Sequence, residues 1–525
     1  MTAANAAQSI TEPASQDSLV AAMMRPEFYP KPPVHVTHKE THISHIFFAG
    51  DLVFKVKKTI RFSFLDYSSL VKRRHYLQEE LRLNRRLAPS VYLGVMPIAF
   101  DTSGWRLGGW AEPGEYTLVM RRLPEKRMLR FLLETHQASA AMMQELAKLL
   151  AGFHHKAERI PIDPEDYAST LERQWNENLT ELKTFLDRNA DREALKAIKN
   201  AGSDFIAVHQ DLLMRRAIEG WIRDVHGDLH AEHICFAPEG IQIFDRIEFS
   251  AKLRRCDLAS EIAFLLMDLT VRGDESLRLP FLSQYRESLP DPDMPLLLPF
   301  FECYRALVRA KVHALRVGRW NDEAARYFRV AQRFTWARFK PFLVMICGFS
   351  GSGKSTLARA LSERLDLPVY NSDVIRKKLS GIGGRRRVVK LNQDIYRPGI
   401  TEKTYASLAR EAEKQILMGN GAILDATFVR KSHRQRIAQL AAKHKISLLA
   451  IHCRISDDIA EKRLRLRAAQ GMDVSDARWA TYRAQKTAYE AMQEFRPGSV
   501  LELDTSAPLE ELVCHCEKFL RSRVT

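Results

Sequence analysis

Apolar and polar residues near the N-terminus follow a pattern that predicts a β-hairpin. Residues 42–48 and 52–58 form two partly apolar runs around a turn at Gly50, as two antiparallel strands require. In the second run, Lys55 alternates with valine and phenylalanine. Residues 69–87 then repeat leucine at helical spacing, so a helix with one apolar face is expected to follow the hairpin.

The middle of the chain is predicted to be mostly helical. A short strand over 116–120 precedes this part, and the helical pattern is clearest over 140–155 and 257–269. Residues 225–249 interrupt it with two short apolar runs that flank a turn. They predict a second hairpin, with acidic residues at both of its ends. Helical spacing returns over 296–333.

Strands and helices alternate in the last third of the chain. Apolar runs of strand length occupy residues 342–347, 367–372, 422–428 and 447–453, and helical patterns occupy residues 357–365 and 401–418. This alternation predicts a doubly wound parallel α/β sheet. Ligands of such sheets bind at the carboxyl ends of the strands.

The loop after the first of these strands has the sequence of a phosphate-binding loop. Residues 348–356 fit the pattern G-x-x-x-x-G-K-[ST], whose glycines let backbone N–H groups surround a phosphate at a helix N-terminus. Lys354 is expected to reach the β/γ-phosphates, and Ser355 to hold Mg²⁺. A chance match is disfavoured because a strand and a helix flank the loop as the motif requires. The predicted nucleotide-binding residues are Gly348, Ser350, Gly351, Ser352, Gly353, Lys354, Ser355 and Thr356.

Composition narrows the class of protein. A chain of 525 residues is too long for one hydrophobic core, so two or three domains are expected. No apolar run approaches the ~18 residues that span a membrane, and residues 1–8 do not resemble a secretion signal. Seven cysteines, mostly in apolar surroundings, favour free thiols and a cytoplasmic location. The net charge of +16 lies mostly in the last third and suits nucleotides, other anions and nucleic acids alike.

A second group of chemically active residues begins with His226-Gly-Asp228. Together with Asp245 downstream, this segment resembles the catalytic core of the aminoglycoside phosphotransferase family, relatives of the protein kinases. The resemblance implies a bilobal kinase-like α+β domain in which Asp228 accepts the proton of the acceptor hydroxyl and Asp245 holds Mg²⁺. His233 replaces the family's Asn; it is a candidate metal ligand, although imidazole suits Mg²⁺ poorly, or it acts by hydrogen bonding. From the residues alone, Asp228 could instead cap the hairpin turn.

The same resemblance assigns an ion pair that grips the α/β-phosphates of the nucleotide. Lys55 ends the strand sequence Leu-Val-Phe-Lys, and Glu80 lies on the next helix. Lys57, Lys58 and Glu79 remain alternatives for these two positions. The ordinary interpretation of such residues is an exposed strand lysine and a solvated helix glutamate.

Residues 342–510 resemble the P-loop kinases related to polynucleotide kinase, zeta toxins and chloramphenicol phosphotransferase. The resemblance implies that Asp373, in an Asp-x-x-Arg element after the second strand, is the general base for the acceptor hydroxyl. It also implies that Arg376 orients the acceptor and that Asp425, at the end of the next strand, orders Mg²⁺. Asp373 could also cap the helix that follows it.

Two arginines resemble the lid of this kinase family. Arg463 and Arg467 lie four residues apart and therefore share a helix face. The resemblance implies that they stabilise charge on the transferred phosphoryl group. A solvated basic helix is the alternative, and the basic run 385–387 fits a flexible loop as well as an acceptor site.

These patterns predict three parts and one main activity. A flexible segment over 1–34 precedes an aminoglycoside-phosphotransferase-like domain over 35–335 and a P-loop kinase domain over 336–525. The predicted activity is ATP- and Mg²⁺-dependent phosphoryl transfer to a hydroxyl of a small-molecule or nucleotide-like acceptor, with the P-loop domain the better equipped centre. No membrane partner is expected, and the oligomeric state cannot be derived from these patterns.

Two other functions are compatible with the same motifs. The first is a switch that hydrolyses ATP and uses the N-terminal domain only for binding. The Asp373-x-x-Arg376 element favours a kinase over this switch, because a switch needs no acceptor base. The second is a nucleic-acid 5′-end kinase, which the positive charge suggests but which no aromatic-rich stacking surface supports.

Overall fold

The computed structural model describes the chain in seven ranges: residues 15–62, 65–102, 104–108, 112–337, 339–380, 397–470 and 479–524. It contains two compact units. The N-terminal unit comprises Met1–Leu186 and Lys199–Val330, and the C-terminal unit comprises Asp187–Ile198 and Ala331–Thr525. Both units contain helices and strands.

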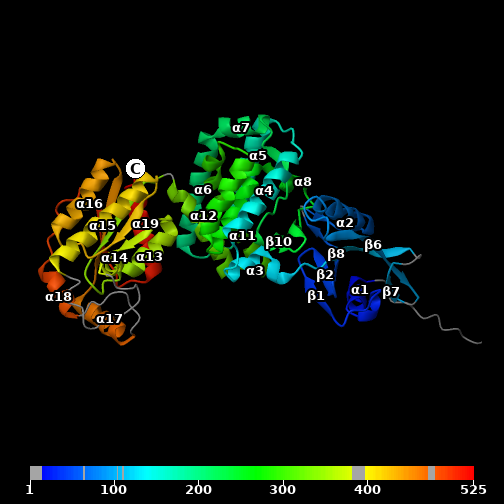
Figure 1. The fold of residues 1–525 in the computed structure, drawn as a ribbon, viewed down its shortest axis with the longest axis horizontal. Helices are drawn as coiled ribbons and strands as arrows, with labels where there is room; N and C mark the ends of the chain where they lie inside the picture. The colour runs from blue at the N-terminus through cyan, green and yellow to red at the C-terminus, as the bar shows by residue number, and fades with distance from the viewer. Residues whose placement is uncertain are drawn as a thin grey trace, which may run out of the picture. The chain divides into compact units, whose positions relative to one another are not determined.

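A six-stranded antiparallel sheet forms the first part of the N-terminal unit, with the order β1-β2-β3-β8-β6-β7 (Figure 1). Its strands are β1 (Val36–Glu40), β2 (Ser44–Ala49), β3 (Leu52–Lys57), β6 (Tyr92–Asp101), β7 (Gly104–Leu107) and β8 (Pro113–Arg121). Ala49 pairs with Leu52 across the turn, so the predicted hairpin around Gly50 is confirmed. Lys55 pairs with Leu118 of β8 and therefore lies within the sheet. The short strands β4 (Arg61–Phe62) and β5 (Leu65–Asp66) pair separately.

Residues 1–14 of the expected flexible segment over 1–34 lie outside the described residues, and residues 15–34 differ from that expectation. Gln16–Met23 forms helix α1, which begins after Ser15, whose side chain accepts the N–H of Ser18. Leu19 and Met23 are fully buried, since their four-residue spacing places them on one helix face against the apolar side of the sheet. Burial of this face stabilises α1 against the sheet.

Helix α2 (Leu70–Asn84) is the predicted helix after the hairpin and packs on the same sheet. Leu77 joins a buried cluster with Tyr92 of β6 and Leu118 of β8. The contact orients the polar face of α2 so that Glu80 is also fully buried. A helix that is polar by composition thus places one carboxylate inside the unit.

The chain from residue 129 to residue 337 is mainly helical, as predicted. The helices are α3 (Leu129–Glu134), α4 (Ala140–Lys156), α5 (Pro164–Lys183), α6 (Asn189–Val208), α7 (Gln210–Ile218), α8 (Ala251–Arg254), α9 (Leu258–Val271), α10 (Arg278–Ser288), α11 (Met294–Val317) and α12 (Asp322–Ala337). Two small antiparallel pairs interrupt them: β9 (Ile222–Asp224) with β12 (Arg255–Asp257), and β10 (Ile234–Ala237) with β11 (Gly240–Ile243). The second pair is the predicted hairpin of residues 225–249. Among the described helices, none is both long and apolar enough to cross a bilayer.

A buried histidine of α4 couples the stability of the N-terminal unit to pH. The His154 ring is fully buried, and its Nδ1 lies 2.8 Å from the hydroxyl of Tyr285, which can donate to it. Burial lowers the pKa of His154 from 6.5 to about 3. Between these values the unfolded chain binds a proton that the folded chain does not. The stability that the neutral ring provides is therefore present above pH 6.5 and is lost as the pH falls toward 3.

Replacing this histidine should flatten the acid limb of the stability curve. We expect His154→Phe to reduce the slope of unfolding free energy against pH by up to about 1.4 kcal/mol per pH unit between pH 6 and 4. Urea titrations that follow the transition of the N-terminal unit in the full chain measure this slope. His155→Phe, at the exposed neighbouring position, is the matched control and should keep the original slope. Equal slopes in both variants would show that His154 does not cause the pH dependence of stability.

A five-stranded parallel sheet forms the centre of the C-terminal unit, with the order β14-β15-β13-β16-β17. The strands are β13 (Phe342–Cys347), β14 (Val369–Asn371), β15 (Ala422–Asp425), β16 (Ser447–Arg454) and β17 (Val500–Asp504). The helices are α13 (Lys354–Leu365), α14 (Ser372–Leu379), α15 (Pro398–Leu417), α16 (Lys431–Lys443), α17 (Asp457–Gln470), α18 (Trp479–Thr487) and α19 (Leu509–Arg521).

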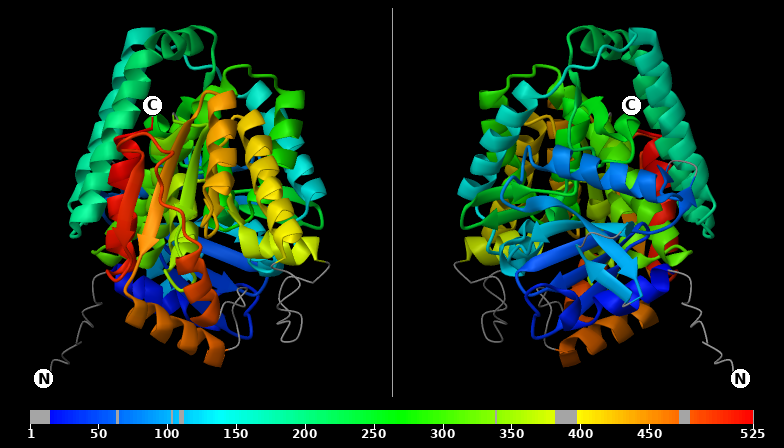
Figure 2. Two further views of the ribbon diagram at one scale, coloured as in Figure 1. Left: turned by 90° about the vertical axis from the view of Figure 1, so that its left-hand side faces the viewer. Right: turned by 90° about the vertical axis from the view of Figure 1, so that its right-hand side faces the viewer.

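Apolar side chains from both faces of this sheet are buried. One cluster joins the sheet to α13 and α19, and the other joins it to α15 and α16. Figure 2 shows the strands between α19, in red, and the yellow to orange helices α15 and α16. The predicted doubly wound parallel sheet is therefore confirmed.

Candidate functional site

The phosphate-binding loop of the C-terminal unit connects β13 to α13 through three left-handed glycines. Gly348, Gly351 and Gly353 have φ angles of +136°, +85° and +83°, a region that side chains rarely adopt. A Cβ atom on Gly348 would lie 2.4 Å from the carbonyl oxygen of Cys453 at the end of β16. The loop thus needs glycine both for its backbone shape and for its close packing on the neighbouring strand.

Side chains of the loop already contact its backbone. The Lys354 ammonium donates to the carbonyl of Phe349 at 2.8 Å. The Ser350 N–H donates to Oε1 of Gln485 at 2.8 Å, and Nε2 of Gln485 donates to the Ser350 hydroxyl at 3.0 Å. The hydroxyl of Ser352 is buried without a hydrogen-bond partner among the described residues. A bound phosphate would give this orphaned hydroxyl an acceptor.

Oxygen ligands for a metal ion lie beside this loop. Nδ2 of Asn371, at the end of β14, donates to Oδ2 of Asp425 at 2.6 Å and lies 3.4 Å from the Ser355 hydroxyl. Asn371 and Asp425 are paired at the carboxyl ends of adjacent parallel strands. Because Mg²⁺ prefers oxygen ligands, Ser355 and Asp425 form a donor set that fits it. The sequence places Asn371 at a strand end but does not show that Asp425 is its partner.

Helix α14 positions the predicted base. Its N-cap is Asn371, whose side-chain oxygen accepts the N–H groups of Asp373 at 2.9 Å and Val374 at 3.1 Å. The capping role considered for Asp373 therefore belongs to Asn371. Asp373 is half-buried in the first turn, and Arg376 is buried one turn later. Their three-residue spacing places both on one helix face.

Of the two predicted lid arginines, the structure places Arg463 against the loop. Its Nη2 donates to the carbonyl of Thr505 at 2.9 Å, and the Thr505 hydroxyl donates to the carbonyl of Ser352 at 2.8 Å. A Cβ atom on Gly353 would lie 3.4 Å from Nη1 of Arg463. The side chain of Arg467 and the basic run 385–387 lie outside the described residues.

In the N-terminal unit, three predicted residues form one ion-pair chain. The Lys55 ammonium lies 2.7 Å from Oε1 of Glu80 and 2.8 Å from Oδ1 of Asp245, although 190 positions separate it from Asp245. Glu79 instead pairs with Arg82 on the surface. The structure thus selects Glu80 over Glu79 as the partner of Lys55.

Lys57 adds a second ion-pair network that the sequence analysis considered only as an alternative. Its ammonium lies 2.5 Å from Oε2 of Glu80 and also contacts Glu248. The hydroxyl of Tyr67 donates to Glu248 at 2.7 Å. Lys57 is completely buried, whereas the ammonium of Lys58 pairs with surface residue Glu40. Glu80 therefore binds one lysine through each carboxylate oxygen.

The loop that carries Asp228 is held by buried acidic residues of α9. Glu261 accepts the backbone N–H groups of His226 at 2.8 Å and Gly227 at 3.1 Å, and Asp268 accepts that of Ala231 at 2.9 Å. Burial raises the pKa of Glu261 to about 7. The pattern over 257–269 predicted the helix that carries Glu261 and Asp268, but a glutamate within an apolar helix gives no signal of its partner.

Asp228 and Asp245 are both kept in the charged form. Although burial opposes it, the nearby His230 and His233 hold the pKa of Asp228 well below its usual range. Lys55 likewise lowers the pKa of Asp245 against the effect of burial. Asp245 also has a left-handed φ of +62°, which is rare for residues other than glycine. Ionised carboxylates at these positions suit a proton acceptor and a metal ligand.

His233 connects the two aspartates. Its Nδ1 lies 2.9 Å from the main-chain carbonyl oxygen of Asp228, and its Nε2 lies 3.5 Å from Oδ2 of Asp245. The ring of His226 accepts the N–H of Asp228 on Nδ1, while its Nε2 lies 2.8 Å from the carbonyl of Phe244. His226 therefore orders the loop that carries Asp228.

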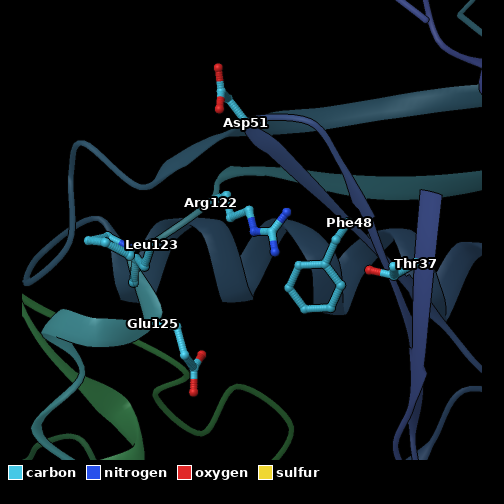
Figure 3. A pocket seen from close by; sticks show the side chains of 7 residues that line it. Thr37, Phe48, Asp51, Arg122, Leu123 and Glu125 are labelled. Carbon is cyan, nitrogen blue, oxygen red and sulfur yellow. The ribbon is translucent and has the colours of Figure 1, made fainter. Parts of the chain in front are cut away.

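A pocket of about 480 Å³ opens beside the sheet of the N-terminal unit. Figure 3 shows the side chain of Arg122 extending toward the ring of Phe48, and its guanidinium carbon lies 5.4 Å from the ring centre. Phe48 pairs with Val53, two residues before Lys55, so the pocket lies on the strands that carry the predicted nucleotide-binding lysine. No local pattern predicts this pocket, because its lining comes from separate strands and a loop. The lining residues are Thr37, Phe48, Asp51, Arg122, Leu123, Pro124 and Glu125.

Comparison with known proteins gives relatives for the whole chain and for its C-terminal part. Residues 343–492 match the sequence profile of the family described as AAA domain. The uncharacterized protein Rv2004c of Mycobacterium tuberculosis is 30% identical over 495 residues, which cover 93% of this chain and 95% of the relative. The uncharacterized protein Mb2027c of Mycobacterium bovis matches with the same identity and coverage.

Comparison with solved structures gives kinases that each cover about a third of this chain. A gluconokinase from Sinorhizobium meliloti covers 35% of this chain and 93% of its own length, with 18% identity and a TM-score of 0.25. The Mycobacterium tuberculosis APS kinase CysC, solved with AMPPNP and APS, covers 35% of this chain and 98% of its own length. Its identity is 18% and its TM-score is 0.27. The family match and the loop geometry make the C-terminal unit a P-loop domain.

Proposed function

We propose that this chain, which belongs to the same family as Rv2004c of Mycobacterium tuberculosis, is a two-site nucleotide-dependent phosphotransferase. The alignment with Rv2004c is longer than either unit, so the family relationship includes residues of both units. The main centre is the C-terminal unit, which transfers the γ-phosphoryl group of ATP to a hydroxyl. The acceptor is a small molecule or a nucleotide-like compound.

One observation carries this proposal. Asn371, at the end of β14, joins the hydroxyl of Ser355 to the carboxylate of Asp425, and Asp373 lies in the first turn of the helix that Asn371 caps. Asn371 thus holds both the proposed metal ligand Asp425 and the helix of the proposed acceptor base Asp373. An enzyme that only hydrolyses ATP needs the metal position but no acceptor base.

Each residue then has a defined task. Asp373 accepts the proton of the acceptor hydroxyl, and Arg376, on the same helix face, orients the acceptor. Lys354 and Arg463 stabilise the negative charge of the phosphoryl group in transit. Mg²⁺, when bound by Ser355 and Asp425, neutralises charge on the nucleotide phosphates.

The direct test is transfer of a labelled γ-phosphate by the full chain. ATP carrying the label is incubated with sugars, aminoglycosides, nucleosides and 5′-hydroxyl oligonucleotides in separate reactions. A labelled small molecule supports the proposal, and a labelled oligonucleotide alone would favour a nucleic-acid 5′-end kinase. ATP loss without any labelled acceptor would favour the switch and contradict the proposal.

Asp373→Asn should separate catalysis from nucleotide binding. Because asparagine cannot accept the proton, we expect transfer to fall by about 10²-fold. The Kd for ATP should change little, since the assigned role of Asp373 concerns the acceptor. Labelled transfer and equilibrium ATP binding measure the two effects, with the exposed Asp458→Asn as the matched control. Transfer at the control rate would exclude Asp373 as the base.

The N-terminal unit supports a second nucleotide site. The chain from Glu80 through Lys55 to Asp245 corresponds to the ion pair and the metal-binding carboxylate of kinase-like phosphotransferases. The aromatic ring of Phe48 and the planar guanidinium of Arg122 provide stacking surfaces suited to a nucleobase. We propose that this unit binds a nucleotide and that Asp228 is its acceptor base.

A further inference from the structure

The metal position of the N-terminal unit does not have the oxygen-only ligands of a magnesium site. Lys57 and Tyr67 hold Glu248, which leaves the carboxylate of Asp245 and the imidazole of His233 as the donor pair between the two aspartate loops. Mg²⁺ demands oxygen ligands and octahedral geometry, so a nitrogen ligand suits it poorly. These residues therefore do not fit Mg²⁺ well.

Hydrogen bonding of His233 leaves one ring nitrogen free to bind a cation. Nδ1 lies 2.9 Å from the carbonyl oxygen of Asp228. A carbonyl oxygen only accepts hydrogen bonds, so Nδ1 carries the hydrogen, and the lone pair of the neutral ring is on Nε2. Histidines that bind metals are usually held in this way, with the other ring N–H donated to a carbonyl or carboxylate.

That lone pair faces a carboxylate oxygen at a distance suited to a shared ion. Nε2 of His233 lies 3.5 Å from Oδ2 of Asp245, whereas Lys55 contacts the other oxygen, Oδ1. Two atoms that each lie about 2.1 Å from one ion are about 3.4 Å apart at the tetrahedral angle. Without a cation between them, Nε2 of His233 and Oδ2 of Asp245 would face each other as two hydrogen-bond acceptors, which repel each other.

The charges around this point also favour a cation. Two ammonium groups are shared among three carboxylates, so negative charge is in excess; these groups are Lys55, Lys57, Glu80, Glu248 and Asp245. The side chain of Asp245 is 42% exposed, which gives an ion access from solvent. The cluster therefore attracts a cation and leaves a path for it.

His230 is near this point but does not fit as a ligand. Its ligand atom lies within 4.8 Å of those of Asp228 and His233. However, its Nδ1 accepts the N–H of Glu232 at 3.3 Å, and its Nε2 lies 3.4 Å from Nη1 of Arg309. A metal ion at this nitrogen would be repelled by the guanidinium.

We propose that Nε2 of His233 and Oδ2 of Asp245 bind a divalent first-row transition ion, of the Mn²⁺, Co²⁺ or Zn²⁺ class, in preference to Mg²⁺. Imidazole suits such ions, and a carboxylate is an acceptable second ligand for each of them. The remaining positions around the ion are open to water or to nucleotide phosphate. The proposal goes beyond phosphoryl transfer, because metal binding at this pair does not require either unit to be catalytically active.

Pulsed EPR of Mn²⁺ bound to the full chain in the absence of nucleotide tests this site directly, because nitrogen coupling is seen when a nitrogen ligand such as imidazole binds the ion. We expect the coupling in the unaltered protein and its loss in His233→Asn. Affinity for Mn²⁺ at this site should fall on the order of tenfold or more in that variant. Mn²⁺ binding without nitrogen coupling in the unaltered protein would overturn the proposal, as would coupling that persists in His233→Asn.

Two matched variants locate the signal. His230→Asn removes the neighbouring imidazole and Asp425→Asn alters the C-terminal metal position, so both should retain the coupling. Its loss in His230→Asn would assign the wrong histidine and overturn the proposal. The unaltered protein provides a test that needs no variant: about 100-fold excess Mg²⁺ should leave the nitrogen-coupled Mn²⁺ in place. Displacement by Mg²⁺ would contradict the stated preference. A failure of phosphoryl transfer would leave all of these readouts intact.

Discussion

Lys354→Ala is expected to lower transfer of the ATP γ-phosphate by about 10²- to 10³-fold in the full chain. The ammonium of Lys354 lies at the start of α13, inside a loop whose glycines admit a phosphate. Its removal deletes the one cation of the loop that the motif directs at the β/γ-phosphates. Equilibrium ATP binding and labelled transfer measure the loss, and both should decrease.

The control for this result is a lysine of the same unit that pairs only at the surface. Lys443→Ala removes an exposed ammonium that contacts Glu413, and it should leave transfer unchanged. Asp228→Asn measures how much of the phosphoryl transfer depends on the N-terminal unit. Transfer that survives Lys354→Ala but is lost in Asp228→Asn would move the main centre to the N-terminal unit.

Arg216→Met is expected to destabilise the N-terminal unit by about 3–5 kcal/mol. The guanidinium of Arg216 is fully buried and lies between two buried carboxylates, 2.7 Å from Asp257 and 2.8 Å from Asp291. Methionine fills similar space but leaves both carboxylates without their cation in a region closed to water. Denaturant titration of the full chain, followed at the N-terminal transition, measures the change.

The neighbouring residue gives a close control. Arg215 pairs with Asp293, but more than half of its side chain is exposed. Because solvent screens such a pair, Arg215→Met should cost no more than about 1 kcal/mol. If the two variants had equal stabilities, the buried network would not contribute as described.

The C-terminal unit could be largely predicted because its signals are local. The loop sequence, the strand before it and the helix after it occupy consecutive positions, and glycine is required by backbone angles that the motif itself implies. Asn371 was missed because its role depends on pairing with Asp425, 54 positions away. Strand order, rather than the local sequence, brings these two residues together.

The N-terminal unit shows the limits of local patterns more clearly. The strand that carries Lys55 and Lys57 was predicted, but alternation alone allowed either lysine to reach the site. The structure brings both to Glu80, because residues two apart on a strand share a face and α2 packs its buried carboxylate there. The order of α1 was likewise missed, since its apolar residues acquire a partner only when the sheet is formed.

By itself, the sequence determined the phosphate-binding loop and the parallel sheet around it, because these depend on short spacings and on the chemistry of single side chains. Only the tertiary structure decided which site residues meet. It joined Lys55 to Asp245, capped α14 with Asn371 instead of Asp373, and turned Nε2 of His233 toward a carboxylate. The physical reason is that hydrogen bonds and ion pairs form between groups a few ångströms apart in space, whatever their separation along the chain.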